Sequence, residues 1–239
     1  MNLVTRPEPQ AAINDVLVQV YASGFVGTEL AWPSTCTDRR DRDRTPSIPG
    51  TSSPQVVTAL GYGTTGLSIG QGVFGLTDSY RDGTLAEYAA VKARNLAPLP
   101  GYVDFTVGAS LPISGLTAWQ GMVEHGRLRP GQSVIAHGAA GAVGSMVTEL
   151  AREFGAYVIG TGRAADHQKV LDFGAKEFVD LEHDTLEDVG RAADRARMMA
   201  QARLIEAYER SRWPRRRPAL KKNQNLVPGR GVELAEFSQ

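Results

Sequence analysis

Apolar and polar residues alternate in short runs over the first hundred positions. The run DVLVQVYASG, Asp15 to Gly24, alternates and ends on glycine, as a half-buried β-strand should. Further β-type runs are separated by Gly and Pro, namely QVVTALGYG, GQGVFGLT and LAEYAAVKARNLAPLP. The mixed-charge run TDRRDRDRTPSIPG between them has no periodicity and predicts an exposed loop. The pattern therefore predicts a compact, loop-rich β domain that reaches about Pro100.

The pattern changes to a helical one from Asp104, with FTVGASLPISGLTAWQGMVEHG. After Pro130-Gly131, VIAH is typical of a buried strand, and SMVTELAREFG has apolar residues at helical spacing and a glycine stop. YVIGTGR predicts a second strand and KEFVD, Lys176 to Asp180, a third. These elements predict a β-α-β unit extended to three parallel strands, with one flank of the sheet unpaired and exposed.

Length and composition limit the classes of protein. A chain of 239 residues with 42% hydrophobic content favours two modest domains. It has no run of 18 apolar residues, and its N-terminal stretch has neither an apolar h-region nor a cleavage site, which argues against membrane insertion and secretion. The single cysteine, Cys36, fits a reducing cytosol, so a cytoplasmic location is expected.

The turn before the predicted helix is rich in glycine. A dinucleotide pyrophosphate binds at a helix N-terminus, where backbone N–H groups and the helix dipole favour an anion. The glycine fingerprint of dinucleotide-binding turns is G-x-G-x-x-G. Aligned with it, this turn is Ala139-x-Gly141-x-x-Gly144, with alanine at the tight-turn position and Gly138 available to relieve the bend. The predicted cofactor-binding residues here are Ala139, Gly141, Ala142, Val143 and Gly144. The alternative is an ordinary strand-to-helix turn.

The second predicted strand ends in YVIGTGR, where an NAD-binding fold would carry an acid for the ribose 2′-hydroxyl. No acid is present there. Gly162 leaves room and Arg163 offers a permanently charged planar donor, which favours NADP(H) over NAD(H). The alternative is that Arg163 only begins a solvated loop.

Residues 13–190 resemble the medium-chain dehydrogenase/reductase superfamily, in particular its zinc-independent quinone-oxidoreductase-like branch. The matching pieces occur in family order and at family spacing: VLVQVYASGFVGTEL, SIPG, LGYGTTGLSIGQGVFGL, RDGTLAEYAAVKARNLAPLP, LPISGLTAWQGM, PGQSVIAHGAAGAVGS and LDFGAKEFVDL. The resemblance implies an α/β fold, with a GroES-like substrate domain over residues 1–105. An incomplete, Rossmann-type dinucleotide-binding sheet is expected over 106–190, and a basic helical or disordered tail over 191–239.

The chain departs from the zinc-dependent members of that superfamily at their ligand positions. Those members carry Cys where this chain has Val26, and Gly-His-Glu where it has Gly50-Thr51-Ser52. The lone cysteine and four scattered histidines cannot assemble a zinc set by spacing. We therefore expect no metal.

The resemblance also implies a reaction. Without a metal to polarise a carbonyl, the expected activity is hydride transfer from NADPH to an electron-poor acceptor, a quinone or an α,β-unsaturated carbonyl compound. Thr117 matches the family position near the nicotinamide ring, and Thr28 matches a hydroxyl near the substrate, the candidate catalytic group. Thr28 could equally be a turn residue. A homodimer is left open, and no membrane partner is expected.

The resemblance stops near Gly190, where the charge balance also changes. Residues 191–239 carry 12 Lys and Arg against 5 Asp and Glu, whereas residues 1–190 carry 14 against 21. RAADRARMMAQARLIEAYER predicts an amphipathic helix, and the Pro-, Arg- and Lys-rich stretch past Trp213 predicts disorder. The tail is either a basic appendage for nucleic acid or anionic surfaces, or non-family sequence from a reading-frame change, which we favour.

Three classes of function follow from these observations. The first is the NADPH-dependent oxidoreductase, with little hydride transfer expected because the cofactor domain reads as incomplete. The second is a non-catalytic NADPH-binding or interaction protein, and the third, less favoured, is a nucleic-acid binder through the basic tail.

Overall fold

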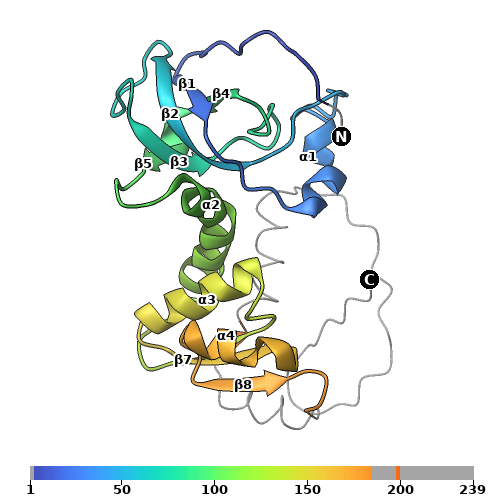
Figure 1. Cartoon of the computed structure of the whole chain (residues 1–239), viewed down its shortest axis with the longest axis vertical. Coiled ribbons are helices and arrows are strands. Elements are labelled where there is room, and N and C mark those ends of the chain that lie inside the picture. Colours follow the sequence, from blue (N-terminus) through green and yellow to red (C-terminus); the bar gives the residue numbers. More distant parts are fainter. Residues whose placement is uncertain (1–2, 185–197, 200–239) are drawn as a thin grey trace. The chain divides into compact units, whose positions relative to one another are not determined.

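The computed structural model describes residues 3–184 and 198–199 (Figure 1). The chain divides into two compact units, Met1–Leu116 and Thr117–Gln239, which are taken in turn. No helix in the described part of the chain is long and apolar enough to cross a membrane.

The first unit contains an antiparallel five-stranded sheet with the order β4-β1-β2-β3-β5. Each strand overlaps a predicted β-type run, because one face of a strand must be apolar to reach the core, although β2 begins three residues before its predicted run. The bounds are β1 Asp15–Val20, β2 Ser52–Leu60, β3 Gly72–Leu76, β4 Tyr88–Lys92 and β5 Leu96–Pro98. The buried valines of β1, β2, β3 and β4 form one core cluster: Val16, Val18, Val57, Val73 and Val91.

A buried carboxylate lies at the start of the first strand. Asp15 is fully buried and forms ion pairs with Arg81 at 2.8 Å and Lys92 at 2.6 Å. Burial alone would raise the pKa of Asp15, but the hydrogen bonds from Arg81 and Lys92 outweigh it, so the pKa lies below its ordinary value.

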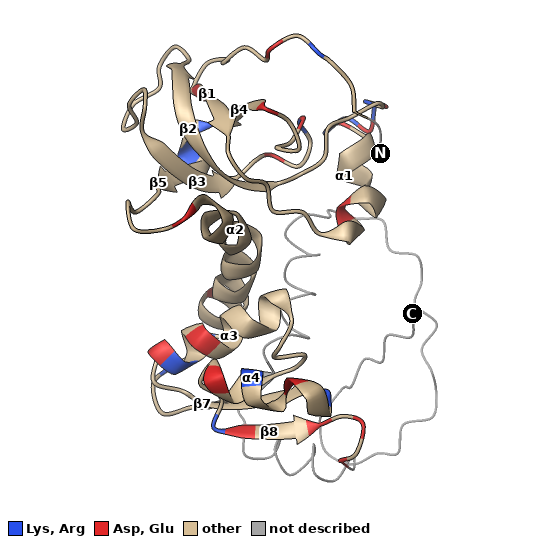
Figure 2. Cartoon of the chain, in the orientation of Figure 1, with Lys and Arg blue, Asp and Glu red and all other residues tan. Residues whose placement is uncertain are grey.

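Short helical segments connect the strands, and a longer helix follows them. In chain order they are η1 Gly27–Ala31, α1 Pro33–Cys36, η2 Ala93–Asn95, α2 Phe105–Trp119 and the π-helical η3 Gln120–His125. The helical pattern predicted from Asp104 is confirmed by α2 and η3. α2 carries no charged residue, as its uniform colour shows in Figure 2.

The second unit contains a parallel sheet with the order β8-β7-β6-β9. Two helices connect its strands, α3 Ala142–Glu153 after β6 and α4 His167–Asp172 after β7, the latter preceded by the short η4 Ala164–Asp166. The strands are β6 Ser133–Ala136, β7 Tyr157–Gly162, β8 Glu177–Asp180 and β9 Met198–Met199. The predicted β-α-β unit and its third strand are confirmed.

The fourth strand corrects two expectations. Met198 and Met199 pair in parallel with Val134 and Ile135 of β6, so the flank of β6 that the sequence leaves unpaired is covered over two residues. The same two methionines lie in the stretch predicted to be an amphipathic helix, which is wrong at these positions. An unpaired strand edge offers backbone donors and acceptors to any chain that reaches it, and this non-local pairing outweighs helical propensity. The rest of the predicted helix and the predicted disorder past Trp213 lie outside the described residues.

Candidate functional site

The glycine-rich turn joins β6 to α3 by a tight bend. Gly138 adopts φ +61°, in the left-handed region that glycine enters without penalty, so it makes the bend that Ala139 could not. The N–H of Gly141 donates to the carbonyl oxygen of Gly138 at 2.9 Å. Gly141 is the extended N-cap of α3, and the helix starts at Ala142. Because the first N–H groups of an α-helix have no acceptor within the helix, this turn presents donors at a helix N-terminus.

Glycine occupies positions 141 and 144 of the turn for different structural reasons. A Cβ at Gly144 would lie 2.2 Å from the carbonyl oxygen of Gly138, so only glycine lets the helix pack this closely on the turn. A Cβ at Gly141 would meet the oxygen of Gly138 at 3.2 Å and no other non-adjacent atom of the described residues within 4 Å. Apart from this one tight contact, no described atom fills the space beside Gly141, and a bound phosphate requires such space.

A threonine of the next strand holds this turn. The N–H of Ala139 donates to the carbonyl oxygen of Thr161 at 2.9 Å. The Thr161 hydroxyl lies 2.8 Å from Nδ1 of His137 and 3.4 Å from the backbone nitrogen of Gly138. Thr161 is buried and is not among the residues that the sequence predicts for the site. Its only sequence signal is its place between two glycines, which says nothing about contact with a turn some twenty residues earlier.

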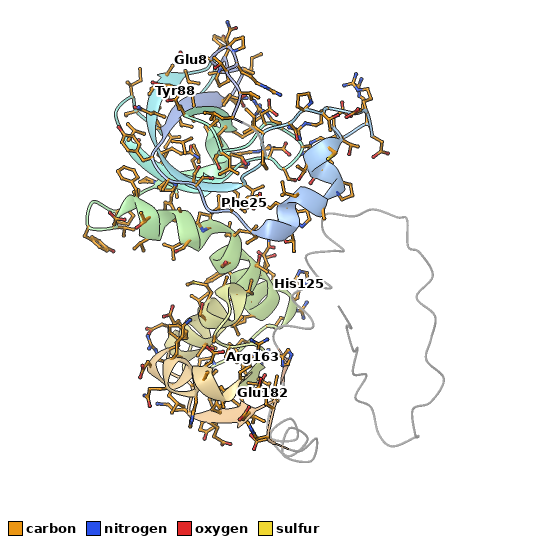
Figure 3. All side chains as sticks on the ribbon, turned by 45° about the vertical axis from the view of Figure 1, so that its right-hand side comes forward. Glu8, Phe25, Tyr88, His125, Arg163 and Glu182 are labelled. Atoms are coloured by element: carbon orange, nitrogen blue, oxygen red, sulfur yellow. The ribbon has the colours of Figure 1, made fainter. Side chains whose placement is uncertain are left out.

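Gly162 and Arg163 lie at the carboxyl end of β7, the edge of the sheet at which the turn also lies. β6 and β7 are parallel, with Ala136 opposite Gly160, so both strands end on the same side. Gly162 is buried, and a Cβ there would make ordinary contacts of 3.4 Å or more, to the Phe178 ring. Arg163 is exposed, with its Nε 3.9 Å from Oε1 of Glu182 (Figure 3).

The predicted site residues thus fall into three groups. The turn and the β7 end come together as the sequence predicts: Ala139, Gly141, Ala142, Val143, Gly144, Gly162 and Arg163. Thr117 is half-buried in α2, at the start of the second unit. Thr28 is exposed in η1 of the first unit. The roles of both threonines stay predictions.

A buried glutamate lies next to Thr28 and was not predicted. The Glu29 side chain is almost inaccessible to solvent and accepts hydrogen bonds from three groups of the first unit. The N–H of Val26 donates at 3.3 Å, the N–H of Gly50 at 3.2 Å and the hydroxyl of Thr51 at 3.2 Å. The Glu29 carboxylate thus joins the two segments in which zinc-dependent members of the resembled superfamily carry their zinc ligands. In this chain Val26 and Thr51 offer neither a thiolate nor an imidazole at those positions. The expectation of no metal stays a prediction.

One group of side chains in the described residues has metal-ligand spacing. Donor atoms of Asp180, Glu182 and His183 lie within 4.8 Å of one another, after β8. Glu182 and His183 are exposed, and exposed acidic groups of this kind are common without an ion. The cluster therefore carries no metal assignment.

Comparison with known proteins covers both units of the chain. Residues 12–101 match the family model of the alcohol dehydrogenase GroES-like domain. The quinone oxidoreductase of Homo sapiens is 33% identical over 165 residues, which are 69% of this chain and 49% of that protein. The structure of an alcohol dehydrogenase superfamily protein from Novosphingobium aromaticivorans has a TM-score of 0.72 at 30% identity, covering 80% of this chain and 58% of that one.

The chain belongs to the medium-chain dehydrogenase/reductase superfamily. Among its members it is quinone-oxidoreductase-like. Another solved member, the quinone oxidoreductase from Thermus thermophilus, described alone and in complex with NADPH, has a TM-score of 0.68 at 27% identity and covers 83% of this chain and 61% of that one. This medium-chain dehydrogenase/reductase chain spans about half the length of the curated relatives it matches.

Proposed function

We propose that the turn between β6 and α3 binds the pyrophosphate of a nicotinamide dinucleotide. The surroundings of Gly141 carry the proposal: packing excludes a side chain at Gly144, whereas a Cβ at Gly141 would meet a single backbone oxygen, at 3.2 Å, and no other non-adjacent described atom within 4 Å. The N–H groups at the start of α3 supply donors to the phosphates, and the helix dipole adds to their attraction. The residues present therefore fit such a cofactor.

The adenosine end of the cofactor would lie against the end of β7. Gly162 is buried and would offer only backbone beside the ribose, and the guanidinium of Arg163 would pair with a 2′-phosphate, which favours NADP(H) over NAD(H). The Thermus thermophilus relative, whose structure was solved with NADPH, supports the same cofactor for this chain.

The reaction we propose is the metal-free reduction of a quinone or an α,β-unsaturated carbonyl compound. Bound NADPH would supply the hydride and leave as NADP⁺, and a proton from solvent would complete the reduction. Thr117 would contact the nicotinamide side of the cofactor, and the Thr28 hydroxyl would donate to the substrate oxygen that gains charge. Quinone oxidoreductases among the relatives support this substrate class.

A binding titration run beside a turnover assay tests the proposal. The 239-residue chain is titrated with NADPH and with NADH, and NADPH consumption is followed against a panel of quinones and enones. Arg163→Ala should weaken NADPH binding about tenfold and leave NADH binding nearly unchanged, since only NADPH has a 2′-phosphate to lose. Lys176→Ala, an exposed cation that precedes β8, is the matched control.

The outcomes separate the three functional classes. Binding with turnover supports the oxidoreductase, and binding without turnover supports a non-catalytic cofactor-binding protein. If the chain binds neither NADPH nor NADH, the proposed site is wrong. Salt-dependent affinity for DNA that disappears when residues 191–239 are deleted would instead support a nucleic-acid binder.

A further inference from the structure

The chain after β8 runs beside the residue proposed to bind the 2′-phosphate. β7 and β8 are parallel, with Gly162 opposite Asp180. The N–H of Leu181 donates to the carbonyl oxygen of Gly162 at 2.9 Å, which extends this pairing past the end of both strands. Acidic residues at the end of β8 and in the loop after it therefore lie at the edge of the sheet where β7 ends, and Figure 2 shows red segments in this part of the chain.

The first of these acids is fixed by the loop itself. The carboxylate of Asp180 accepts the N–H of Glu182 at 3.0 Å and lies 2.6 Å from Nδ1 of His183. The hydrogen bond from the Glu182 N–H, followed by that from His183, lowers the pKa of Asp180. Asp180 is thus anionic at neutral pH, and its carboxylate holds the backbone of Glu182 in place.

Glu182 and Arg163 form a weak and accessible pair. The distance from Arg163 Nε to Glu182 Oε1 is 3.9 Å, and the two side chains are 80% and 55% exposed (Figure 3). An exposed pair at this distance contributes little to stability, so an incoming ligand can separate the two charges at low cost. A phosphate would still have to displace the carboxylate from Arg163 and would then lie close to its negative charge.

We propose that Glu182 is a specificity-determining residue that weakens the preference of this site for NADPH over NADH. It competes with the 2′-phosphate for Arg163, and it supplies near the ribose the acid that the end of β7 lacks. NADH has a 2′-hydroxyl there, which can donate a hydrogen bond to the carboxylate. NADPH has a phosphate there, which the carboxylate repels. The inference rests on the proposed cofactor site and assigns the discrimination to two residues that follow neighbouring strands, Arg163 after β7 and Glu182 after β8.

The test compares dissociation constants for NADPH and NADH in the full 239-residue chain. Glu182→Gln should tighten NADPH binding about two- to five-fold and leave NADH binding unchanged or slightly weaker, in the range expected for an exposed charge pair. Glu182→Lys should increase the effect, because it adds a second cation beside the phosphate. The change should shrink at about 1 M salt, where charges are screened beyond roughly 3 Å.

Two controls separate this effect from a general change in charge. Glu153→Gln removes one exposed negative charge on α3 and should leave both dissociation constants unchanged. In an Arg163→Ala background, Glu182→Gln should lose at least half of its effect on NADPH, because the competition for Arg163 no longer exists.

The failures of the two proposals are distinguishable. If the unmodified chain binds neither dinucleotide, the proposed function fails and this inference fails with it. If both bind, and Glu182→Gln changes their affinities equally or leaves them unchanged, the inference is overturned and the cofactor site stands.

Discussion

The carbonyl oxygen of Thr161 accepts the N–H of Ala139 at 2.9 Å, which joins the second strand of the parallel sheet to the turn after the first. The Thr161 hydroxyl adds contacts to His137 and to the Gly138 nitrogen. Since the turn must present its N–H groups in one direction, a strand that holds it in place prepares the site before a ligand arrives.

Thr161→Val tests this relationship. Valine keeps the shape of threonine and the backbone hydrogen bond but removes the hydroxyl, so we expect a loss of about 1 kcal/mol in unfolding free energy and a several-fold weaker affinity for NADPH. Thr58→Val is the control, because it removes the hydroxyl that donates to Leu17 in the first sheet. The control should lower stability without changing NADPH affinity; equal affinities for both variants would show that Thr161 does not prepare the turn.

Gly141→Asp should remove cofactor binding while the fold persists. The substitution places a carboxylate beside the helix start, where the pyrophosphate should lie, and we expect NADPH affinity to fall at least tenfold, about 1.4 kcal/mol. Gly141→Ala adds only a Cβ that meets the oxygen of Gly138 at 3.2 Å, so its effect on binding should be smaller. Calorimetric titration of both variants measures the difference, and unchanged NADPH binding by Gly141→Asp would place the pyrophosphate elsewhere.

Gly144→Ala should instead damage the fold. Its Cβ would lie 2.2 Å from the carbonyl oxygen of Gly138, a backbone atom that cannot move without shifting the turn from the helix. We expect the unfolding free energy to fall by about 2 kcal/mol, measured by denaturant unfolding. Gly115→Ala is the control, since the site is helical and, apart from the neighbouring backbone of α2 itself, no atom of the described residues lies within 4 Å of that Cβ. It should be neutral or stabilise by up to about 1 kcal/mol.

Because Asp15 forms ion pairs with Arg81 and Lys92, we expect the unfolding free energy of the chain to fall at acidic pH. The pKa of this carboxyl is lower in the folded chain than in the unfolded one, so its contribution is fully present above the unfolded value, about 3.9, and is lost as pH falls through the folded value. Asp15→Asn should cost about 1–3 kcal/mol at pH 7, because Arg81 and Lys92 lose their anion.

Thermal midpoints measured from pH 7 to pH 3 check the prediction for Asp15. The unmodified chain should lose stability below about pH 4 more steeply than Asp15→Asn, because the variant has no carboxylate to protonate there. Asp172→Asn, at an exposed position of α4, serves as the control and should follow the unmodified chain. Parallel curves for all three proteins would show that Asp15 does not contribute to the acid transition.

Every strand of the two sheets except β9, and the residues of the glycine-rich turn, could be predicted from the sequence. Alternation in DVLVQV, the buried run VIAH and the spacing of Gly141 and Gly144 are local signals, and each reflects a local requirement of backbone or burial. The sequence identifies both turn glycines, but only the structure shows that packing requires Gly144, whereas a Cβ at Gly141 would meet one backbone oxygen at 3.2 Å.

Contacts between residues distant in the sequence were decided by the tertiary structure alone. The sequence pattern predicts a helix at Met198 and Met199, but in the structure these residues pair as a strand with the available edge of β6. Thr161 reaches the turn, and Glu182 reaches Arg163, because parallel strands end at one edge of the sheet and bring together whatever follows each of them. The family, the strands other than β9 and the turn could thus be recognised in the sequence. Which side chains surround that turn depended on the pairing of the strands, because periodicity carries no information about which distant segments become neighbours.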